Sequence, residues 1–425
     1  MRPLLGMLML VLAARAAVAE ELTMGQAVSI ALSRNHEAIA AALDIDTAML
    51  DRVQAGLYPN PILSYTLGNI VLGPANDQMA GVRPSPFGQT VHSLGISEVV
   101  DIWAKRNTRL RAADRSVEHK RLQVQDALRE IVYAVRSSFA DVLREQSEFT
   151  LAKETQARYE ETVGLSRKRF AAGDISDAEL KKVELEGLRY QNGVIDSEMQ
   201  LDLARQKLAA LLALGSADRL PSLQGEALPD EKRKPFVVQQ LIDQAFAERP
   251  DVQAARVAKL LSEATLTQAR REAFPDISLG LTYTHSEFTV SGDNPNSLAL
   301  GLSLPIPVFD RNQANIGRAQ VDIRRAENDA KRLAIVVQHE VADAARRALR
   351  SDRLLDAFEG GMLERADSSL KVAEKSYKAG AVSLLELLEA QRTYIEIRSQ
   401  YLRAMYDYRQ AAIDVLHAIG EKGVK

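Results

Sequence analysis

The sequence contains no cysteine among its 425 residues. This absence excludes a disulfide framework, a thiol nucleophile, thiolate metal ligands and a lipid anchor on an N-terminal cysteine. Outside the N-terminal segment the sequence also lacks any apolar run of about 18 residues, so a span by an apolar helix is excluded there. Only helices and closed barrels satisfy their backbone hydrogen bonds in lipid. Any membrane span of the mature chain must therefore be made of β-strands.

Proline is missing from two long stretches. None of the 14 prolines lies between Pro86 and Pro221 or after Pro307. Because proline disrupts the interior of a helix, such stretches predict long helices. The first, from Trp103 to Ala172, contains only one glycine, Gly164, and would form a helix of roughly 100 Å at 1.5 Å per residue. The chain is therefore expected to contain rods far longer than an average helix.

The sequence also lacks a large excess of charge of either sign. Its formal net charge is only −3, which gives no signature of nucleic-acid binding. The first 19 residues, by contrast, are typical of a secretory signal peptide. Arg2 precedes an apolar run from Leu4 to Ala14, and Ala17-Val18-Ala19 offers a small-residue cleavage site. We expect residues 1–19 to be removed and the protein to leave the cytoplasm.

Two β-hairpins, 62–99 and 277–304, interrupt the helical pattern. In the second, apolar residues alternate with small or hydroxylated ones from Ile277 to Tyr283 and from Leu298 to Leu304. In the first, the strands are predicted at 62–68 and 91–99. The strand centres of the second hairpin carry no charge on either face, which favours strands with lipid on one side and a lumen on the other. A buried core hairpin is the alternative.

The order of elements repeats along the chain. A helical segment from Leu22 to about Tyr58, a hairpin, a very long helix, a glycine turn and a returning helix form residues 20–214, a linker follows at 215–235, and the same order returns in 236–425. Four strands cannot close a barrel, and an open sheet edge is not tolerated in lipid. We therefore expect the chain to oligomerise, and three copies would supply twelve strands.

At this point the sequence resembles the TolC-like outer-membrane factor family over nearly all of the mature chain. The duplicated order and the two glycine turns carry the resemblance. It implies a mainly α fold with a membrane β-barrel part: a trimeric duct in which each chain gives four β-strands to a 12-stranded barrel and long helices to a periplasmic α-barrel. It also implies a non-enzymatic protein of the Gram-negative outer membrane that extends into the periplasm.

The resemblance implies the passive exit duct of a tripartite efflux pump. The implied partners are two further copies of the chain, a periplasmic membrane-fusion adaptor, an inner-membrane RND transporter and outer-membrane lipid. Within the family, Leu57-Tyr58-Pro59-Asn60-Pro61 and the run from Pro305 to Gln313 are similar to the branch that serves cobalt, zinc and cadmium efflux. Efflux of drugs or other small molecules is the alternative. A periplasmic coiled-coil adaptor is a remote alternative, because it should have one hairpin of rods and a lipoyl-like β domain, which this sequence lacks. An adhesin or autotransporter stalk is another, because it would not repeat after about 200 residues.

The two glycine turns are expected to be the periplasmic tips that dock the adaptor, because glycine can adopt positive φ and reverse the chain tightly. Turns without a partner are the alternative. The residues concerned are Ala172, Gly173, Asp174, Ile175, Ser176, Ala379, Gly380, Ala381, Val382 and Ser383.

Glu386 and Glu389 are the candidates for a periplasmic aperture. They lie three residues apart just past the second tip and share one helix face. The resemblance implies that threefold symmetry turns such acids into rings that attract cations, and that Tyr377 matches a position that helps to hold the entrance shut. Val382 stands where some family members have an arginine. A solvated acidic helix face is the alternative.

Four aromatic residues flank the hairpins: Tyr58 and Phe274 come before them, Trp103 and Phe309 after them. Their matching places suggest an aromatic belt at the membrane interface, and packing of the hairpin bases is the alternative. The six histidines show no paired-ligand spacing, although His92 and His285 could approach one another. We expect no metal site and no cofactor, and no catalytic motif is present.

Overall fold

The computed structural model describes residues 21–70, 87, 89–225, 237–287 and 293–421. The predicted signal peptide and residues 226–235 of the predicted linker lie outside these residues. The chain divides into two compact units. The helical unit is Met1–Ala42, Gln125–Pro250 and Ala334–Lys425, and the sheet unit is Leu43–Val124 and Asp251–Leu333.

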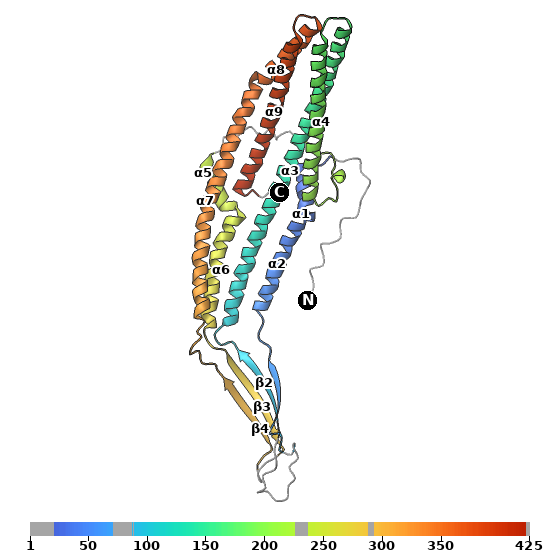
Figure 1. Ribbon diagram of the computed structural model, residues 1–425. Helices are drawn as coiled ribbons and strands as arrows, with labels where there is room; N and C mark the ends of the chain where they lie inside the picture. The colour runs from blue at the N-terminus through green and yellow to red at the C-terminus, as the bar shows by residue number, and fades with distance from the viewer. Residues whose placement is uncertain (1–20, 71–86, 88, 226–236, 288–292, 422–425) are drawn as a thin grey trace. The chain divides into compact units, whose positions relative to one another are not determined.

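The elements follow the same order in both halves of the chain (Figure 1). The first half contains α1 (Met24–Arg34), α2 (His36–Ala55), β1 (Ile62–Gly68), β2 (Val91–Val100), α3 (Lys105–Ala171), α4 (Asp177–Leu211) and the short η1 (Ala217–Arg219). The second contains α5 (Val238–Glu248), α6 (Pro250–Glu272), β3 (Ile277–Ser286), β4 (Asn296–Ser303), α7 (Gln313–Ala357), η2 (Phe358–Met362), α8 (Leu363–Lys378) and α9 (Leu384–Ile419).

The prediction of a single helical segment from Leu22 to Tyr58 is wrong, because the helix is interrupted at Asn35. The backbone of Asn35 is extended there, with φ −63° and ψ 128°. Its side-chain oxygen accepts a hydrogen bond from the N–H of Glu37 at 2.8 Å, and its amide nitrogen donates to the carbonyl of Leu211 at 2.9 Å. Asn35 thus ends α1, begins α2 and holds the end of α4.

Arg249 occupies the equivalent place in the second half, between α5 and α6. Its guanidinium donates to the carbonyl of Ala418 near the end of α9 at 3.1 Å and pairs with Glu340 at 2.7 Å. The side chain is only 3% exposed, so the charge is stabilised by these partners. In both halves, therefore, a side chain at the break between two helices binds the end of the returning helix. This side chain is Asn35 in the first half and Arg249 in the second.

The expectation of a second uninterrupted rod is also wrong. α7 ends at Ala357, and a π-helical turn with non-helical backbone at Gly360 and Gly361 separates it from α8. Gly361 has φ +108°, a conformation that side-chain-bearing residues rarely adopt. The first rod, α3, runs through 67 residues without such a break.

The core of the helical unit gathers small and branched side chains from its helices. Around Phe139 of α3, which is 1% exposed, pack residues of α1, α4, α9 and the segment after α4. The segment after α4 is tied to the residues just before α1 by the parallel pairing of Leu223 with Leu22. This core comprises Leu22, Ala27, Val28, Ala31, Ala38, Ile131, Val135, Phe139, Val142, Leu143, Leu208, Leu212, Leu220, Leu223 and Tyr406.

The four strands form one antiparallel sheet in the order β1-β2-β3-β4. The register aligns the large residues of all four strands, because Leu63 faces Ile96, Ile96 faces Leu281 and Leu281 faces Leu300. Side chains alternate between the faces of a sheet, so the large residues share one face. This apolar face holds Leu63, Tyr65, Leu67, His92, Leu94, Ile96, Glu98, Leu279, Leu281, Tyr283, His285, Asn296, Leu298, Leu300 and Leu302.

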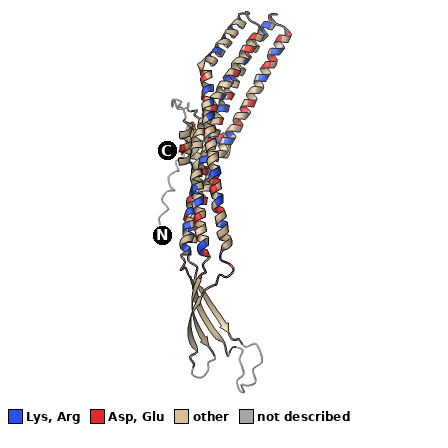
Figure 2. Cartoon of the chain, turned by 90° about the vertical axis from the view of Figure 1, so that its left-hand side faces the viewer, with Lys and Arg blue, Asp and Glu red and all other residues tan. Residues whose placement is uncertain are grey.

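The opposite face, here called the small face, is lined mainly by glycine, alanine, serine and threonine. Gly95 faces Thr282, and Gly280 faces Gly301. Figure 2 shows Lys, Arg, Asp and Glu spread along the helices, whereas the strands are nearly free of them. Among the four strands only Glu98 carries such a charge. Within the described part of the chain, no helix is long and apolar enough to cross a membrane.

Candidate functional site

The two predicted tips are the same structure built twice. After α3, the N–H of Asp174 donates to the carbonyl of Arg169 at 2.9 Å and that of Gly173 to Phe170 at 3.0 Å. After α8, Ala381 donates to Ser376 at 2.8 Å and Gly380 to Tyr377 at 3.0 Å. These paired bonds define a Schellman motif, which requires the left-handed conformation seen at Gly173 (φ +82°) and Gly380 (φ +73°).

Serine begins the returning helix after each tip, but the two caps differ. Ser176 and Glu179 form a capping box, in which the Glu179 carboxylate accepts from the N–H of Ser176 at 2.8 Å. Ser383 accepts from the N–H of Glu386 at 3.3 Å, yet no bond returns from the Glu386 carboxylate. The third residue of each helix is thus a glutamate, and only the first is used within the chain.

Glu386 and Glu389 are both exposed on the first turns of α9, whereas Leu387 and Leu388 between them are buried. Neither glutamate forms an ion pair with another described residue of the chain. Burial of the two leucines fixes the helix face, so both carboxylates lie on the face that is free of intrachain packing.

Tyr377, the third predicted aperture residue, is buried between helices of the same chain. It is 2% exposed and belongs to a small core with Tyr159, Val183, Leu384, Leu387 and Leu388. Its hydroxyl lies 3.4 Å from that of Ser166 on α3, and the guanidinium of Arg169 lies over its ring at 4.9 Å. In this arrangement Tyr377 joins α3 to α8 and the start of α9.

Sequence reasoning missed the ion pair between Glu186 of α4 and Arg392 of α9. Two guanidinium nitrogens of Arg392 lie 2.6 and 3.2 Å from one carboxylate oxygen of Glu186, whose side chain is 13% exposed. The pair connects the two returning helices of the repeats close to the tips. A contact between residues so far apart in sequence leaves no local pattern by which it could have been found.

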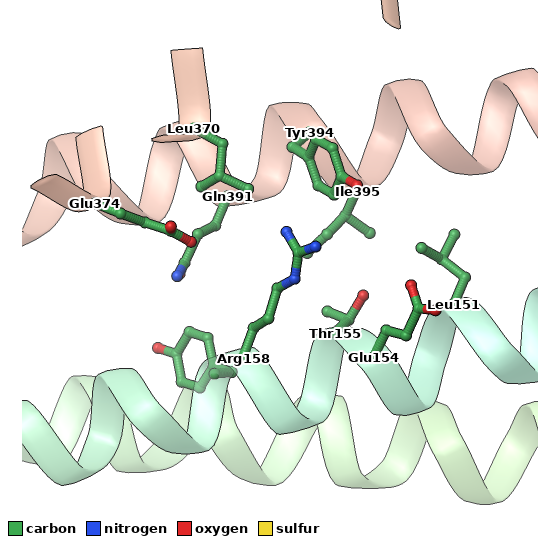
Figure 3. Close-up of a pocket in the computed structure, with 10 residues that line it drawn as sticks. Leu151, Glu154, Thr155, Arg158, Leu370, Glu374, Gln391, Tyr394 and Ile395 are labelled. Atoms are coloured by element: carbon green, nitrogen blue, oxygen red, sulfur yellow. The ribbon is translucent and has the colours of Figure 1, made fainter. Parts of the chain in front are cut away.

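A pocket lies between α3, α8 and α9 (Figure 3). Arg158 extends across it toward Tyr394, and its guanidinium lies 5.4 Å from the centre of that ring. The pocket has a cavity volume of about 20 Å³, enough for a single water molecule. The hydroxyl of Tyr159 and the side-chain oxygen of Gln391 have no hydrogen-bond partner among the described residues, and burial raises the pKa of Tyr159.

The four aromatic residues that flank the hairpins lie in two settings. Trp103 and Phe274 stack with ring centres 4.8 Å apart, and the Trp103 indole donates to the carbonyl of Pro275 at 3.0 Å. Tyr58 is 62% and Phe309 89% exposed, and Arg106 lies over the Tyr58 ring. Trp103 and Phe274 thus pack the base of a hairpin, whereas Tyr58 and Phe309 are exposed on the surface of the chain.

The histidine pair noted in the sequence does come together: His92 and His285 are direct partners across β2 and β3. Over the described residues, however, no three His, Asp or Glu side chains stand close enough, as arranged, to hold a metal ion. The other described histidines are scattered over α2, α3, α7 and α9.

The chain is similar in sequence to known resistance and export proteins over most of its length. The chain is 25% identical over 401 residues to the cobalt-zinc-cadmium resistance protein CzcC of Cupriavidus metallidurans, covering 94% of this chain and 90% of that protein. It is 23% identical over 403 residues to the pyoverdine export outer membrane protein OpmQ of Pseudomonas putida, covering 93% and 85%.

The fold is that of solved outer-membrane channels. The crystal structure of CusC, described as forming a transmembrane channel, superposes with a TM-score of 0.75 at 21% identity and covers 93% of this chain and 92% of that one. The predicted family resemblance, the mainly helical TolC-like fold and the outer-membrane location are thereby confirmed. Residues 27–214 and 241–421 match the family described as outer membrane efflux protein. The chain belongs to the outer membrane efflux protein family.

Proposed function

We propose that this protein is the exit duct of a tripartite efflux pump for divalent heavy-metal cations. The observation that supports a metal cargo is the similarity to CzcC, which covers 94% of this chain and 90% of that resistance protein. The run from Pro305 to Gln313, which resembles the same branch, is a second support. As a passive duct, the protein needs no catalytic group.

The proposed assembly is a trimer whose three sheets join into one twelve-stranded barrel. β1 and β4 are the edge strands of the sheet, and each is paired on one side only within the chain. Lipid contains no water to satisfy the open edges, so each edge must pair with another chain. The separation of an apolar face from a small face supports lipid outside and a lumen inside.

The two Schellman turns are proposed to dock the periplasmic adaptor, which in turn connects the duct to an RND transporter. They present the same backbone form twice, at Gly173 and Gly380. A Cβ added at either glycine would meet no atom within 4 Å, so each turn surface is open. Two equivalent open surfaces per chain suit an adaptor ring that repeats around the trimer.

Glu386 and Glu389 are proposed to form rings of carboxylates at the periplasmic entrance. Both are exposed and unpaired among the described residues, although basic residues are abundant in the chain. Rings of acidic side chains select cations in narrow pores. These carboxylates would concentrate divalent cations at the entrance and let them block the pore at high concentration.

Export of a small organic molecule is the second candidate, because OpmQ, named for pyoverdine export, covers nearly as much of the chain. Deleting the gene in its native host and measuring growth inhibition separates the two. We expect increased sensitivity to zinc, cobalt or cadmium, restored by the native gene. Loss of tolerance only to organic compounds would replace the metal proposal with the organic one, and unchanged tolerance to both would contradict an efflux role under the tested conditions.

A further inference from the structure

Within the sheet unit, the helices that adjoin the sheet follow the order of the strands. α2 leads into β1 and α7 leaves β4, so each of these two helices adjoins an edge strand. On its inner side, α2 pairs with α3 through Arg52 and Asp114, and α7 pairs with α6 through Glu327 and Lys259, which are 2.9 Å apart. The outer sides of α2 and α7 are therefore the two edges of this helical row (Figure 1).

The outer side of α2 carries an apolar stripe that no described residue covers. Leu43 and Leu50 are seven residues apart and Val53 follows three residues later; their side chains are 58%, 69% and 57% exposed. This spacing is that of a helix packed along another helix. Asp46 takes the one polar place in the stripe, and its exposed carboxylate has no ion-pair or hydrogen-bond partner among the described residues.

The outer side of α7 has the opposite charge. Val321 is 46% exposed, whereas Ala319, on the other side of the helix, is buried. Arg318 and Arg325 lie one turn before and one turn after Val321. Both guanidinium groups are exposed, and neither forms an ion pair with another described residue. An apolar side chain between two bases on α7 thus complements an acid between apolar side chains on α2.

A threefold axis would bring these two sides together. Pairing of β4 in one copy with β1 in the next places α7 of the first beside α2 of the second, and rotation about the axis leaves the height of every residue unchanged. Ile62 in β1 aligns through β2 and β3 with Gly301 in β4, so the two edge strands meet their helices at one level. Asp46 lies nine residues before the end of α2, and Val321 lies eight after the start of α7. The two residues are therefore at similar heights.

We propose that α2 of each copy packs against α7 of the next copy, with Asp46 between Arg318 and Arg325 of its neighbour. The contact rests on the trimer of the proposed function and names the helices that join its copies beside the barrel. It is a head-to-tail contact that closes after three copies. Apolar packing would stabilise it, and a single acid within an apolar stripe fixes the register of two helices.

The absence of cysteine makes crosslinking a direct test. Asp46→Cys and Val321→Cys are combined in one full-length chain, and outer-membrane vesicles are treated with a short bismaleimide. We expect covalent dimers and trimers on a denaturing gel, because each copy carries both halves of the contact. Either cysteine alone should give only monomers. So should Asp46→Cys with Arg271→Cys, whose second cysteine is exposed on the inner helix α6.

Substitutions in the stripe test the packing without a crosslink. Leu50 is exposed in the single chain, so Leu50→Ser should not disturb its folding but should lower the temperature at which the trimer dissociates by several degrees. Met49→Ser, in the same helix but beside the stripe, should change that temperature much less. Asp46→Arg should also lower it, and Arg318→Asp with Arg325→Asp in the same chain should restore part of the loss.

The mass of the native protein in detergent separates failure of this contact from failure of the proposed duct. A native trimer whose cysteine pair gives no link between copies would overturn the contact and leave the duct standing. A native monomer would overturn both. An unchanged dissociation temperature in Leu50→Ser, together with loss of binding to a co-expressed adaptor, would assign the stripe to the adaptor instead of to a second copy.

Discussion

The long helices of the two repeats follow the same plan with different continuity. α3 runs unbroken from Lys105 to Ala171, whereas the corresponding path in the second repeat is α7, a π-helical turn and α8. Aligned from the tips, Gly360 and Gly361 stand where the first repeat has Lys153 and Glu154. Two glycines in place of two good helix formers are enough to permit the break.

The same comparison at the helix starts shows how a shared position acquires a separate use. Glu179 and Glu386 are both the third residue of a returning helix, three residues after a serine cap. The first carboxylate closes a capping box, and the second is left free. Duplication therefore preserves the backbone, and the side chains are then available for unequal roles.

The largest effect is expected on the apolar face of the sheet, to which both repeats contribute large apolar residues. Ile96 of the first hairpin and Leu300 of the second flank Leu281 in one row across the sheet. Arginine at either position should destabilise the folded protein by about 2–4 kcal/mol if the row lies near the middle of the bilayer. Urea unfolding in lipid vesicles measures this. Gly301→Arg, on the small face, should instead change conductance, and an equal loss of stability there would contradict the facing.

A smaller effect is expected to separate two glycines of the small face, Gly95 and Gly301. A Cβ at Gly95 would lie 2.8 Å from the hydroxyl oxygen of Ser64 and 3.1 Å from that of Thr282, whereas at Gly301 it would meet only a carbonyl at 3.9 Å. Gly95→Ala should therefore destabilise by about 1–3 kcal/mol, typical of overpacking, and Gly301→Ala by much less. Adding Ser64→Ala to Gly95→Ala should restore part of the loss. Equal midpoints of thermal unfolding for the two glycine variants would rule out this difference.

Replacing a glycine by alanine is expected to change stability in opposite directions in the two rods, because only the second rod is broken. Gly361 has φ +108°, so Gly361→Ala should destabilise by about 1–2 kcal/mol. Gly164 lies inside α3 with no atom near its Cβ position, so Gly164→Ala should stabilise by up to about 1 kcal/mol. Denaturant midpoints of the two variants give the comparison. Stabilisation by both would mean that the second rod can straighten without loss.

The sequence was sufficient where the signals are local. Missing prolines predicted α3, alternation predicted the strands to within a few residues, and the tip glycines lie where the turns require positive φ. The break at Gly360 and Gly361 also had a local signal, which the absence of proline outweighed. The partners of Asn35 and Arg249 had none, because each binds the end of a helix far along the chain.

The candidate site divides in the same way. The exposed acids of α9 followed from helix spacing, since buried leucines at neighbouring positions fix the face. The burial of Tyr377 did not, because it depends on α3 packing against α8. Nor did the ion pair of Glu186 with Arg392, which joins the returning helices of different repeats. Contacts between repeats carry no period that a single sequence displays.

The smallest expected effect concerns the two glutamates that begin the returning helices. The hydrogen bond from the N–H of Ser176 holds the pKa of Glu179 below its ordinary value of 4.5. A lowered carboxyl pKa contributes stability at pH above the ordinary value, and this contribution is lost as the pH falls through the lowered one. Glu179→Gln should therefore reduce the unfolding midpoint slightly at pH 7, and the difference should disappear in acid. Glu386 makes no such bond, so Glu386→Gln should leave the midpoint unchanged at both pH values while reducing cation selectivity in planar bilayers. An equal shift in midpoint for the two variants would show that the second carboxylate also caps its helix, and unchanged selectivity would place it away from the pore.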